Sequence, residues 1–495
     1  MKIWIITSVL LVIVFATGCT SIPNVPKNNI VMVNGKGSLV NPGPNLFKFH
    51  CKLRPYKRFK TDEEKIAHLN SVIDQLNTGI QIQAARGMEK RKVMIFIHGG
   101  LNTQVETVKR AANIFKAMKK DKAHEQIAPV FINWQSSLAS SYTDHLLYIR
   151  QGKDMRNDRN KLKCVLTTSL CPFYFVADLL KAIGKAPIIW TMQCLNNVGR
   201  NFDSDDVKTA RKRFSNKPEI YDVRQGKKEY KHSLGTQLLN FTSKILFPVR
   251  ILTSPFVDAL GGSSWDNMYR RTSTPFNRDK DFNREEFYFE TRGWLARFFE
   301  QLREVEKDMN GKLEITLIGH SMGTIMINEI LRKYDDMNIK NIVYMAAACS
   351  VRNYHDSVYP YLKKHDDTKM YHLVLHDRAE FDERPWAWLD IAPRGSLLVW
   401  IDHFLAKPNT KLDRTAGRYC NLMITDHLTP LELLKRIHVK QFDYGSGVEN
   451  TQPQKHGDFD AFPFWERDFW EPHKIPEDKD QFKPEFKAFR RTRKR

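Results

Sequence analysis

The run from Ile315 to Gly323 constrains the fold more than any other stretch, and it reads Ile-Thr-Leu-Ile-Gly-His-Ser-Met-Gly. Residues typical of a buried strand lead directly into a Gly-x-Ser-x-Gly pattern, and residues typical of a helix follow from Thr324. This order predicts a nucleophile elbow, a sharp turn that pushes the hydroxyl of Ser321 out of the sheet, with Gly319 and Gly323 leaving room for neighbouring chain. A chance match in a surface turn is the alternative, and the flanking strand and helix argue against it.

Strands and helices alternate through much of the remaining chain. Apolar runs of strand type occur on both sides of the elbow, and segments with helical spacing of apolar residues separate several of them. This alternation predicts an α/β fold with a mostly parallel, doubly wound sheet. The other predicted strands are Val93–Ile97, Ala128–Trp134, Asn341–Ala347 and Tyr371–Leu375, and the main predicted helices are 61–86, the segment ending near Lys119, and 284–309.

The alternation stops at about Gln135 and resumes near Arg284, so residues 135–283 are expected to form an insertion. Its apolar segments are 165–180, 187–195 and 238–260, and charged residues or prolines interrupt the first and last, so none is expected to span a bilayer. We expect the helices of an inserted cap. Their apolar faces either pack against the main domain or lie on a membrane surface, and both alternatives fit the pattern.

Three further segments lie outside the alternating strands and helices. Residues 19–60 contain short strand-like pieces at Ile30–Val33 and Leu46–Leu53, and are expected to form a tether and edge strands. A second insertion is expected at about 385–440, and a basic tail is expected at 471–495.

The N-terminus has the anatomy of an export signal. Met1 and Lys2 form a short positive region, and the apolar run from Ile3 to Phe15 is too short to span a bilayer comfortably. The following Ala-Thr-Gly-Cys19 resembles a bacterial lipobox, which implies a signal peptide over residues 1–18 and a diacylglycerol on the sulfur of Cys19. The same resemblance implies a lipid anchor in the cell envelope, and Thr20 in place of Asp favours the outer membrane of a Gram-negative cell. An ordinary secretory signal is the alternative.

Composition narrows the class of protein and of partner. The chain has 495 residues, is 42% hydrophobic and carries a formal charge of +22. The apolar content excludes a disordered protein, and the positive excess favours an anionic surface. No stretch resembles a nucleic-acid-binding module, so we expect acidic lipid as the partner and no nucleic acid. A solvated basic surface without a partner is the alternative.

The cysteines do not predict a metal site. Besides Cys19, six occur at positions 51, 164, 171, 194, 349 and 420, and their spacing fits no zinc pattern. An exported protein could oxidise some of them, but we expect buried free thiols. No metal and no other cofactor is expected.

A reactive serine needs donors for the oxyanion that forms when it attacks a carbonyl. His98-Gly99-Gly100 follows the predicted strand that ends at Ile97, where glycine backbone can approach a substrate closely. One N–H of Gly99, Gly100 or Leu101, together with that of Met322, would form the oxyanion hole. A plain glycine-rich turn is the alternative.

The serine also needs an imidazole to take its proton and a carboxylate to orient that imidazole. Asp377 follows the predicted strand that ends at Leu375, and it is the preferred acid, with Glu380 and Asp382 in the same loop as alternatives. His456 is the preferred base because it lies beside a glycine in a loop late in the chain. The other late histidines are His403, His427, His438 and His473, and His320 is expected to be a packing residue.

These motifs together resemble the α/β-hydrolase superfamily, of the serine esterase and lipase kind. The resemblance rests on His98-Gly99-Gly100, on the Gly-x-Ser-x-Gly of the elbow, and on the order Ser321, Asp377, His456. It covers roughly residues 61–134 and 284–470, with the insertion as a departure that leaves the substrate class open. It implies ester hydrolysis through an acyl-enzyme, and the location favours a lipid-like ester such as a phospholipid or acylglycerol. An acyltransferase and a non-enzymatic binding lipoprotein are the alternatives.

Overall fold

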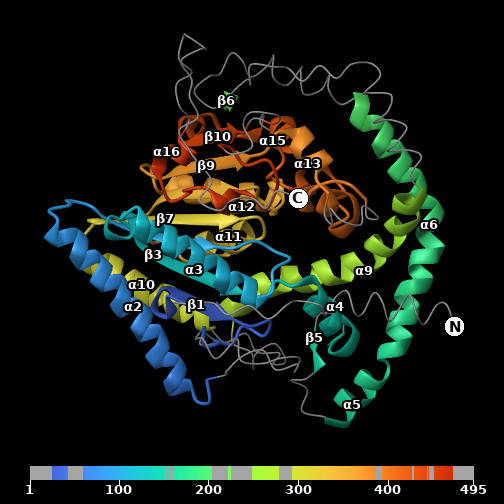
Figure 1. Cartoon of the computed structure of the whole chain (residues 1–495), viewed down its shortest axis with the longest axis horizontal. Coiled ribbons are helices and arrows are strands. Elements are labelled where there is room, and N and C mark those ends of the chain that lie inside the picture. Colours follow the sequence, from blue (N-terminus) through green and yellow to red (C-terminus); the bar gives the residue numbers. More distant parts are fainter. Residues whose placement is uncertain are drawn as a thin grey trace.

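A parallel β-sheet flanked by helices forms the centre of the protein (Figure 1). This computed structural model describes residues 25–42, 59–150, 153–155, 161–202, 221–223, 248–277, 293–384, 393–425, 428–442, 444 and 451–471. The strand order is β1-β3-β2-β7-β8-β9-β10-β6, and all neighbours in this sheet are parallel. The strands are β1 (Ile30–Val33), β2 (Arg91–Ile97), β3 (Ala128–Trp134), β6 (Tyr221–Val223), β7 (Leu313–His320), β8 (Ile339–Met345), β9 (Lys369–Val374) and β10 (Ile437–Gln441).

The arrangement confirms the α/β class and the parallel sheet that the alternating pattern predicts. The central strands are buried on both faces, which is why their sequences are nearly continuous apolar runs. β3 has the predicted limits, and β2, β7, β8 and β9 differ from the predicted limits by at most two residues. β1 lies at one end of the sheet as an edge strand beside β3, as Ile30–Val33 predicts.

Two long helices beside the sheet, α2 and α3, begin at capping side chains. The side chain of Thr61 accepts the N–H of Glu64 at the start of α2, and Thr103 and Glu106 form a capping box at the start of α3. The helices of the core are α2 (Asp62–Ala85), α3 (Gln104–Lys120), α10 (Trp294–Asp308), α11 (Gly323–Lys333), α12 (Val351–Lys364), α13 (Asp377–Asp382), α14 (Leu397–Trp400), α15 (Tyr419–Thr425) and α16 (Arg467–Trp470). Short helical turns are η1 (Lys27–Asn29), η3 (Ala123–Glu125), η5 (Thr274–Phe276), η6 (Ile401–Leu405), η7 (Lys411–Asp413), η9 (Leu431–Arg436) and η10 (Phe459–Ala461).

The described part of the segment expected to be an insertion contains four α-helices and a short hairpin. They are α4 (Leu138–Leu147), β4 (Ile149–Arg150), β5 (Lys153–Asp154), α5 (Lys161–Ser169), α6 (Cys171–Phe202) and α9 (Pro248–Ser273). In Figure 1, α6 forms a long curved arc at the side of the molecule, and α9 runs from α6 towards the sheet. The same segment also contributes β6 to the sheet, which the sequence does not predict.

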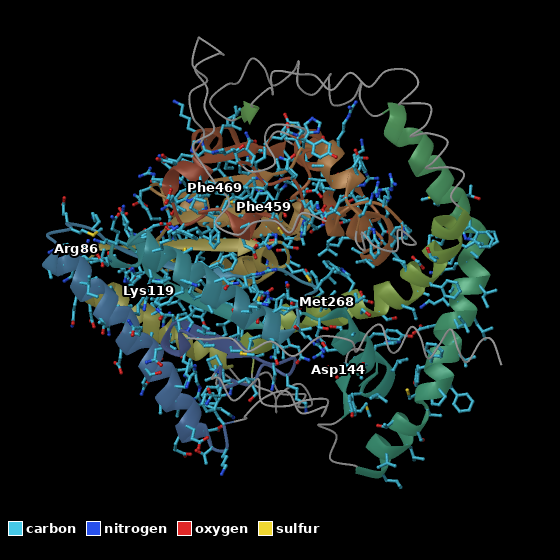
Figure 2. The ribbon with its side chains drawn as sticks, in the orientation of Figure 1. Arg86, Lys119, Asp144, Met268, Phe459 and Phe469 are labelled. Atoms are coloured by element: carbon cyan, nitrogen blue, oxygen red, sulfur yellow. The ribbon has the colours of Figure 1, made fainter. Side chains whose placement is uncertain are left out.

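Buried polar contacts hold α9 in place. Arg271 is almost fully buried, and its guanidinium pairs with Asp144 of α4 at 2.7 Å and donates to Ser141 at 2.8 Å. Figure 2 shows Asp144 and Met268 close to this junction between α4 and α9. None of the described helices is long and apolar enough to cross a membrane.

The C-terminal described segment packs back onto the sheet. Phe459 and Phe469 are fully buried and each contacts Phe442, which follows β10 (Figure 2). This packing fixes the loop that carries His456. Cys19, the strand-like piece 46–53, residues 385–392 and nearly all of the basic tail lie outside the described residues.

Candidate active site

Ser321 lies at the turn between β7 and α11, in strained backbone. Its φ is +53°, in the left-handed region that favours glycine. Its N–H donates to the carbonyl of Met345 at 2.8 Å, and its carbonyl accepts the N–H of Ala348 at 3.1 Å. The neighbouring strand β8 and the loop after it therefore hold the strained turn in place.

The two glycines of the motif are required by close approach of backbone. A Cβ on Gly323 would collide with the carbonyl oxygen of Ile97 at the end of β2. A Cβ on Gly319 would lie 3.0 Å from backbone atoms of Gly323 and Thr324. The spacing of glycines that the sequence displays is therefore explained by the geometry of this turn.

His456 lies beside the candidate nucleophile. Its Nε2 is 2.8 Å from Oγ of Ser321, and both side chains are buried. Burial holds the pKa of His456 well below its usual value, and His320 and Arg110 lower this pKa further. The imidazole is therefore neutral near pH 7 and can accept the serine proton.

Two side chains clamp the peptide groups of His456. Its N–H donates to Oε2 of Glu383 at 2.9 Å, and its carbonyl oxygen lies 2.8 Å from Nε2 of His320. A carbonyl only accepts, so Nε2 of His320 carries the proton. His320 is thus buried against Phe459, as a packing residue should be, and it also fixes the loop of His456. Sequence reasoning missed Glu383 because it lies 73 positions from His456 and no local motif marks the contact.

The other ring nitrogen of His456 has a different environment. Nδ1 is buried and has no hydrogen-bond partner among the described residues. Asp377 is buried at the start of α13, and its Oδ1 accepts the N–H of Cys420 at 3.4 Å. The structure therefore does not bring Asp377 to Nδ1, and the role of Asp377 as the orienting acid stays a prediction, as do the alternatives Glu380 and Asp382. His438, another late histidine, lies in β10 and stacks on Tyr371.

The glycine loop after β2 lies against the elbow. A Cβ on Gly99 would lie 2.7 Å from Cβ of Ser321, and one on Gly100 would lie 2.6 Å from Sδ of Met322. At Gly99 the obstacle is the Cβ of Ser321 itself, whereas at Gly100 it is the flexible side chain of Met322. The structure thus brings together the residues from which the sequence predicts an oxyanion hole.

The direction of the peptide groups in this loop narrows the choice of donors. The side-chain amide of Asn102 donates to the carbonyl oxygens of Gly99 at 3.0 Å and of Gly100 at 2.7 Å. A trans peptide points its C=O and the following N–H in opposite directions, and no described peptide bond is cis. The N–H groups of Gly100 and Leu101 therefore point away from Asn102. Met322 stands at the N-cap of α11, in the turn where N–H groups have no acceptor within the helix.

A buried network supports this loop from behind. Nδ1 of His98 lies 2.7 Å from the carbonyl oxygen of Gly99, and its Nε2 accepts the N–H of Trp134 at 3.0 Å, so the proton sits on Nδ1. Burial and the charge of Arg110 lower the pKa of His98 to about 3, which keeps this ring neutral.

Arg110 of α3 connects the glycine loop to the segment that carries His456. Its Nη2 donates to Oδ1 of Asn102 at 3.1 Å, and its Nε lies 2.5 Å from Oδ2 of Asp460. Asp460 is buried, and it follows His456 by four positions. One cation thus ties the candidate oxyanion loop to the loop of the candidate base.

Glu380 lies on the short helix α13 beside the site, and the raised pKa of its buried carboxyl can be tested. Burial raises its pKa to about 8, with smaller contributions from Glu383 and Asp377. A raised pKa means that the folded state holds a proton that the unfolded state releases above about pH 4.5, so stability is lost as the pH rises from 4.5 to 8. We expect Glu380→Gln, which stays neutral, to be more stable than the wild type at pH 8, by on the order of a few kcal/mol.

Thermal unfolding at pH 5 and pH 8 measures this difference. Glu304→Gln, on an exposed face of α10, is the matched control and should follow the wild type at both values. An equal effect of Glu380→Gln at pH 5 and pH 8 would contradict the assigned ionisation.

In comparisons with known proteins, no protein-family model, no curated protein and no solved structure matches this chain. Among the described residues no group of three or more His, Cys, Asp or Glu side chains could hold a metal ion. Cys171, Cys349 and Cys420 are free thiols, of which Cys349 is fully buried and the other two are half-buried.

Proposed function

We propose that this chain is a serine hydrolase that cleaves carboxylic esters through an acyl-enzyme on Ser321. The observation that carries the proposal is the 2.8 Å separation between Oγ of Ser321 and Nε2 of a neutral, buried His456, at a strained strand-to-helix turn. We also propose that the parallel sheet and its helices form an α/β-hydrolase fold. The nucleophile follows β7, and Asp377 and His456 follow β9 and β10, which lie in this order across the sheet.

The proposed reaction begins when Oγ of Ser321 attacks the carbonyl carbon of the ester. His456 takes the hydroxyl proton on Nε2, and the oxyanion accepts the N–H of Met322 and that of Gly100 or Leu101. The tetrahedral intermediate then collapses, and His456 gives its proton to the leaving alcohol. Water, deprotonated by His456, releases the acyl group and restores the serine. In this proposal the carboxylate of Asp377 moves from its contact with the N–H of Cys420 and accepts a hydrogen bond from Nδ1–H of His456, which stabilises the imidazolium without taking its proton.

The proposed setting is the bacterial cell envelope, with the chain anchored by a lipid on Cys19. The signal-like N-terminus and the formal charge of +22 support a site next to acidic lipid. The proposed substrates are lipid-like esters such as phospholipids or acylglycerols.

Hydrolysis of p-nitrophenyl esters by the purified chain tests the reaction type. We expect turnover of the acetate and butyrate esters with a kcat on the order of 1–10³ s⁻¹, and a higher kcat/KM for longer acyl chains. A folded protein that hydrolyses none of these esters, at any acyl length, would exclude the proposed activity.

The clamp on His456 predicts a positioning role for Glu383. Its carboxylate holds the N–H of His456 at 2.9 Å without touching Oγ of Ser321. Removal of this acceptor should let the imidazole shift, and a shift of about 1 Å costs roughly 10²-fold in rate. We expect Glu383→Ala to lower kcat about 10–100-fold with little change in KM.

Glu383→Gln is the matched variant, because its amide oxygen can still accept the N–H of His456. It should recover most of the lost kcat. If Glu383→Gln were as impaired as Glu383→Ala, the carboxylate charge rather than the hydrogen bond would be responsible, and the positioning role would be wrong.

A further inference from the structure

The inserted helices present an apolar surface that no described residue covers. Six large apolar side chains of α5 and α6 are between 59 and 71% exposed: Leu162, Val165, Phe173, Leu180, Ile183 and Ile188. We call this set the α5–α6 face. Side chains along α6 extend outward, away from the sheet, in Figure 2.

The polarity of α6 is inverted relative to a helix on the surface of a water-soluble domain. Its inner side carries Asp178, Ala182 and Ala186, which are buried towards the protein. Asp178 Oδ2 accepts the hydroxyl of Tyr142 at 3.2 Å and lies 3.0 Å from Nε2 of His145, both on α4. A surface helix normally buries its apolar side and exposes its polar side. On α6 the acid Asp178 and two alanines face the protein, and the large apolar side chains face out.

The exposed apolar side chains are concentrated on this unit. Elsewhere in the described chain each element carries fewer of them: Leu252, Phe256 and Tyr269 on α9, Ile66 and Ile82 on α2, and Leu428 and Leu431 in and before η9, where Leu431 is 80% exposed. Scattered exposed apolar residues are normal, whereas a contiguous apolar surface marks an interaction site. The α5–α6 face therefore requires an apolar partner.

The charged residues of α5 and α6 indicate which apolar partner the α5–α6 face fits. Between residues 161 and 192 the sequence has four lysines, at 161, 163, 181 and 185, and one acid, the inward-facing Asp178. On α6, Lys181 is exposed, whereas Lys185 pairs with Asp258 of α9 at 3.7 Å. A helix with an apolar face flanked by lysines lies in the interface of an anionic bilayer, where acyl chains take up the apolar side chains and headgroups pair with the cations. The large exposed apolar side chains lie on one side of α6 and the opposite side packs on the protein, so the pattern fits a helix that lies on the bilayer surface.

We propose that the α5–α6 face rests in the interface of an anionic lipid bilayer, as a membrane contact separate from the lipid expected on Cys19. This contact orients the folded domain on the membrane, which a lipid on a long tether does not do. The proposal rests on the exposed apolar side chains, the buried Asp178 and the lysines of α5 and α6. It does not depend on the chemistry of Ser321.

Site-specific photo-crosslinking tests the proposal in the full chain. A benzophenone analogue of phenylalanine replaces Phe173 in one sample and Leu431 in the matched control, and each protein is reconstituted with phosphatidylglycerol-containing vesicles. We expect lipid adducts at position 173 to exceed those at position 431 on the order of tenfold. With phosphatidylcholine alone, or at high salt, the adducts at position 173 should fall several-fold.

The outcomes separate the alternatives. Protein adducts at position 173 in native membranes would assign the face to a protein partner, and equal lipid adducts at both positions would remove any specific contact; either result overturns the proposal. In the second variant, Leu180→Glu with Ile183→Glu, lipid adducts at position 173 should drop about tenfold, while Leu431→Glu should not change them. The same crosslinks should form with Ser321→Ala, so failure of the membrane contact and failure of the proposed hydrolysis are distinguishable.

Discussion

Replacing Ser321 by alanine is expected to lower kcat for p-nitrophenyl butyrate by at least about 10³-fold, because the variant lacks the hydroxyl that forms the proposed acyl-enzyme. The fold should be unaffected, since the side chain is small and its backbone contacts to Met345 and Ala348 remain. Initial rates measured with matched amounts of folded protein test this expectation. Ser71→Ala on α2, remote from the elbow, is the control and should retain wild-type activity.

Replacement of His456 tests whether it acts together with Ser321. His456→Ala should lose activity to a similar extent, because the variant lacks the imidazole that contacts Oγ of Ser321. Residues that act as a unit are strongly non-additive, so the double variant should be no worse than either single variant. Additive losses, or wild-type turnover by Ser321→Ala, would show that the two residues do not work together.

Gly323→Ala is expected to have the largest effect on the fold of the site. Its methyl group would meet the carbonyl oxygen of Ile97, so the strand β2 and the elbow must move apart. Forcing extra volume into a packed position costs about 1–3 kcal/mol, and more where backbone is the obstacle. We expect a lower thermal midpoint and a loss of activity of at least about 10²-fold, since the glycine loop that follows β2 moves with it.

Gly457→Ala is the matched control for this substitution. Gly457 follows the candidate base directly, and a Cβ there would meet nothing within 4 Å. Its stability and activity should stay close to the wild type. A tolerant Gly323→Ala would contradict the close approach on which the elbow depends.

The sequence predicts the elbow well because its signal is local. The Gly-x-Ser-x-Gly pattern, the strand before it and the helix after it occupy a single continuous stretch, and the collisions at Gly319 and Gly323 account for the motif. The buried strands are also recognisable, since a strand covered on both faces needs an unbroken apolar run.

Strands and helices that mix apolar residues with charged residues or proline are not recognised from the sequence in this way. β10 carries Lys440 in a buried position, where its ammonium donates to the carbonyl of Phe469 at 2.9 Å, so the strand does not read as apolar. α12 contains Pro360, which obscures its helical pattern. Neither element is predicted from the sequence, although both belong to the core.

Contacts between distant segments are the least predictable part of the candidate site. The pairing of Ser321 with His456 could be proposed from chain order, but the hold of Glu383 on His456 and the Arg110 bridge between two loops depend on tertiary packing. The polarity of α6 is a similar case, because its sequence is compatible with either a packed or an exposed apolar side. The burial of Asp178, Ala182 and Ala186 in the folded protein shows which side faces out.

Covalent labelling by a small fluorophosphonate tests the central proposal most directly. The serine oxygen displaces fluoride from phosphorus and becomes phosphonylated, which is fast only where a base and oxyanion donors activate the serine. We predict a single adduct, mapped by peptide mass spectrometry to Ser321, that is absent from Ser321→Ala and strongly reduced in His456→Ala. Folded wild-type protein that gains no adduct, or gains one on another residue, would contradict the assignment of Ser321 as the nucleophile.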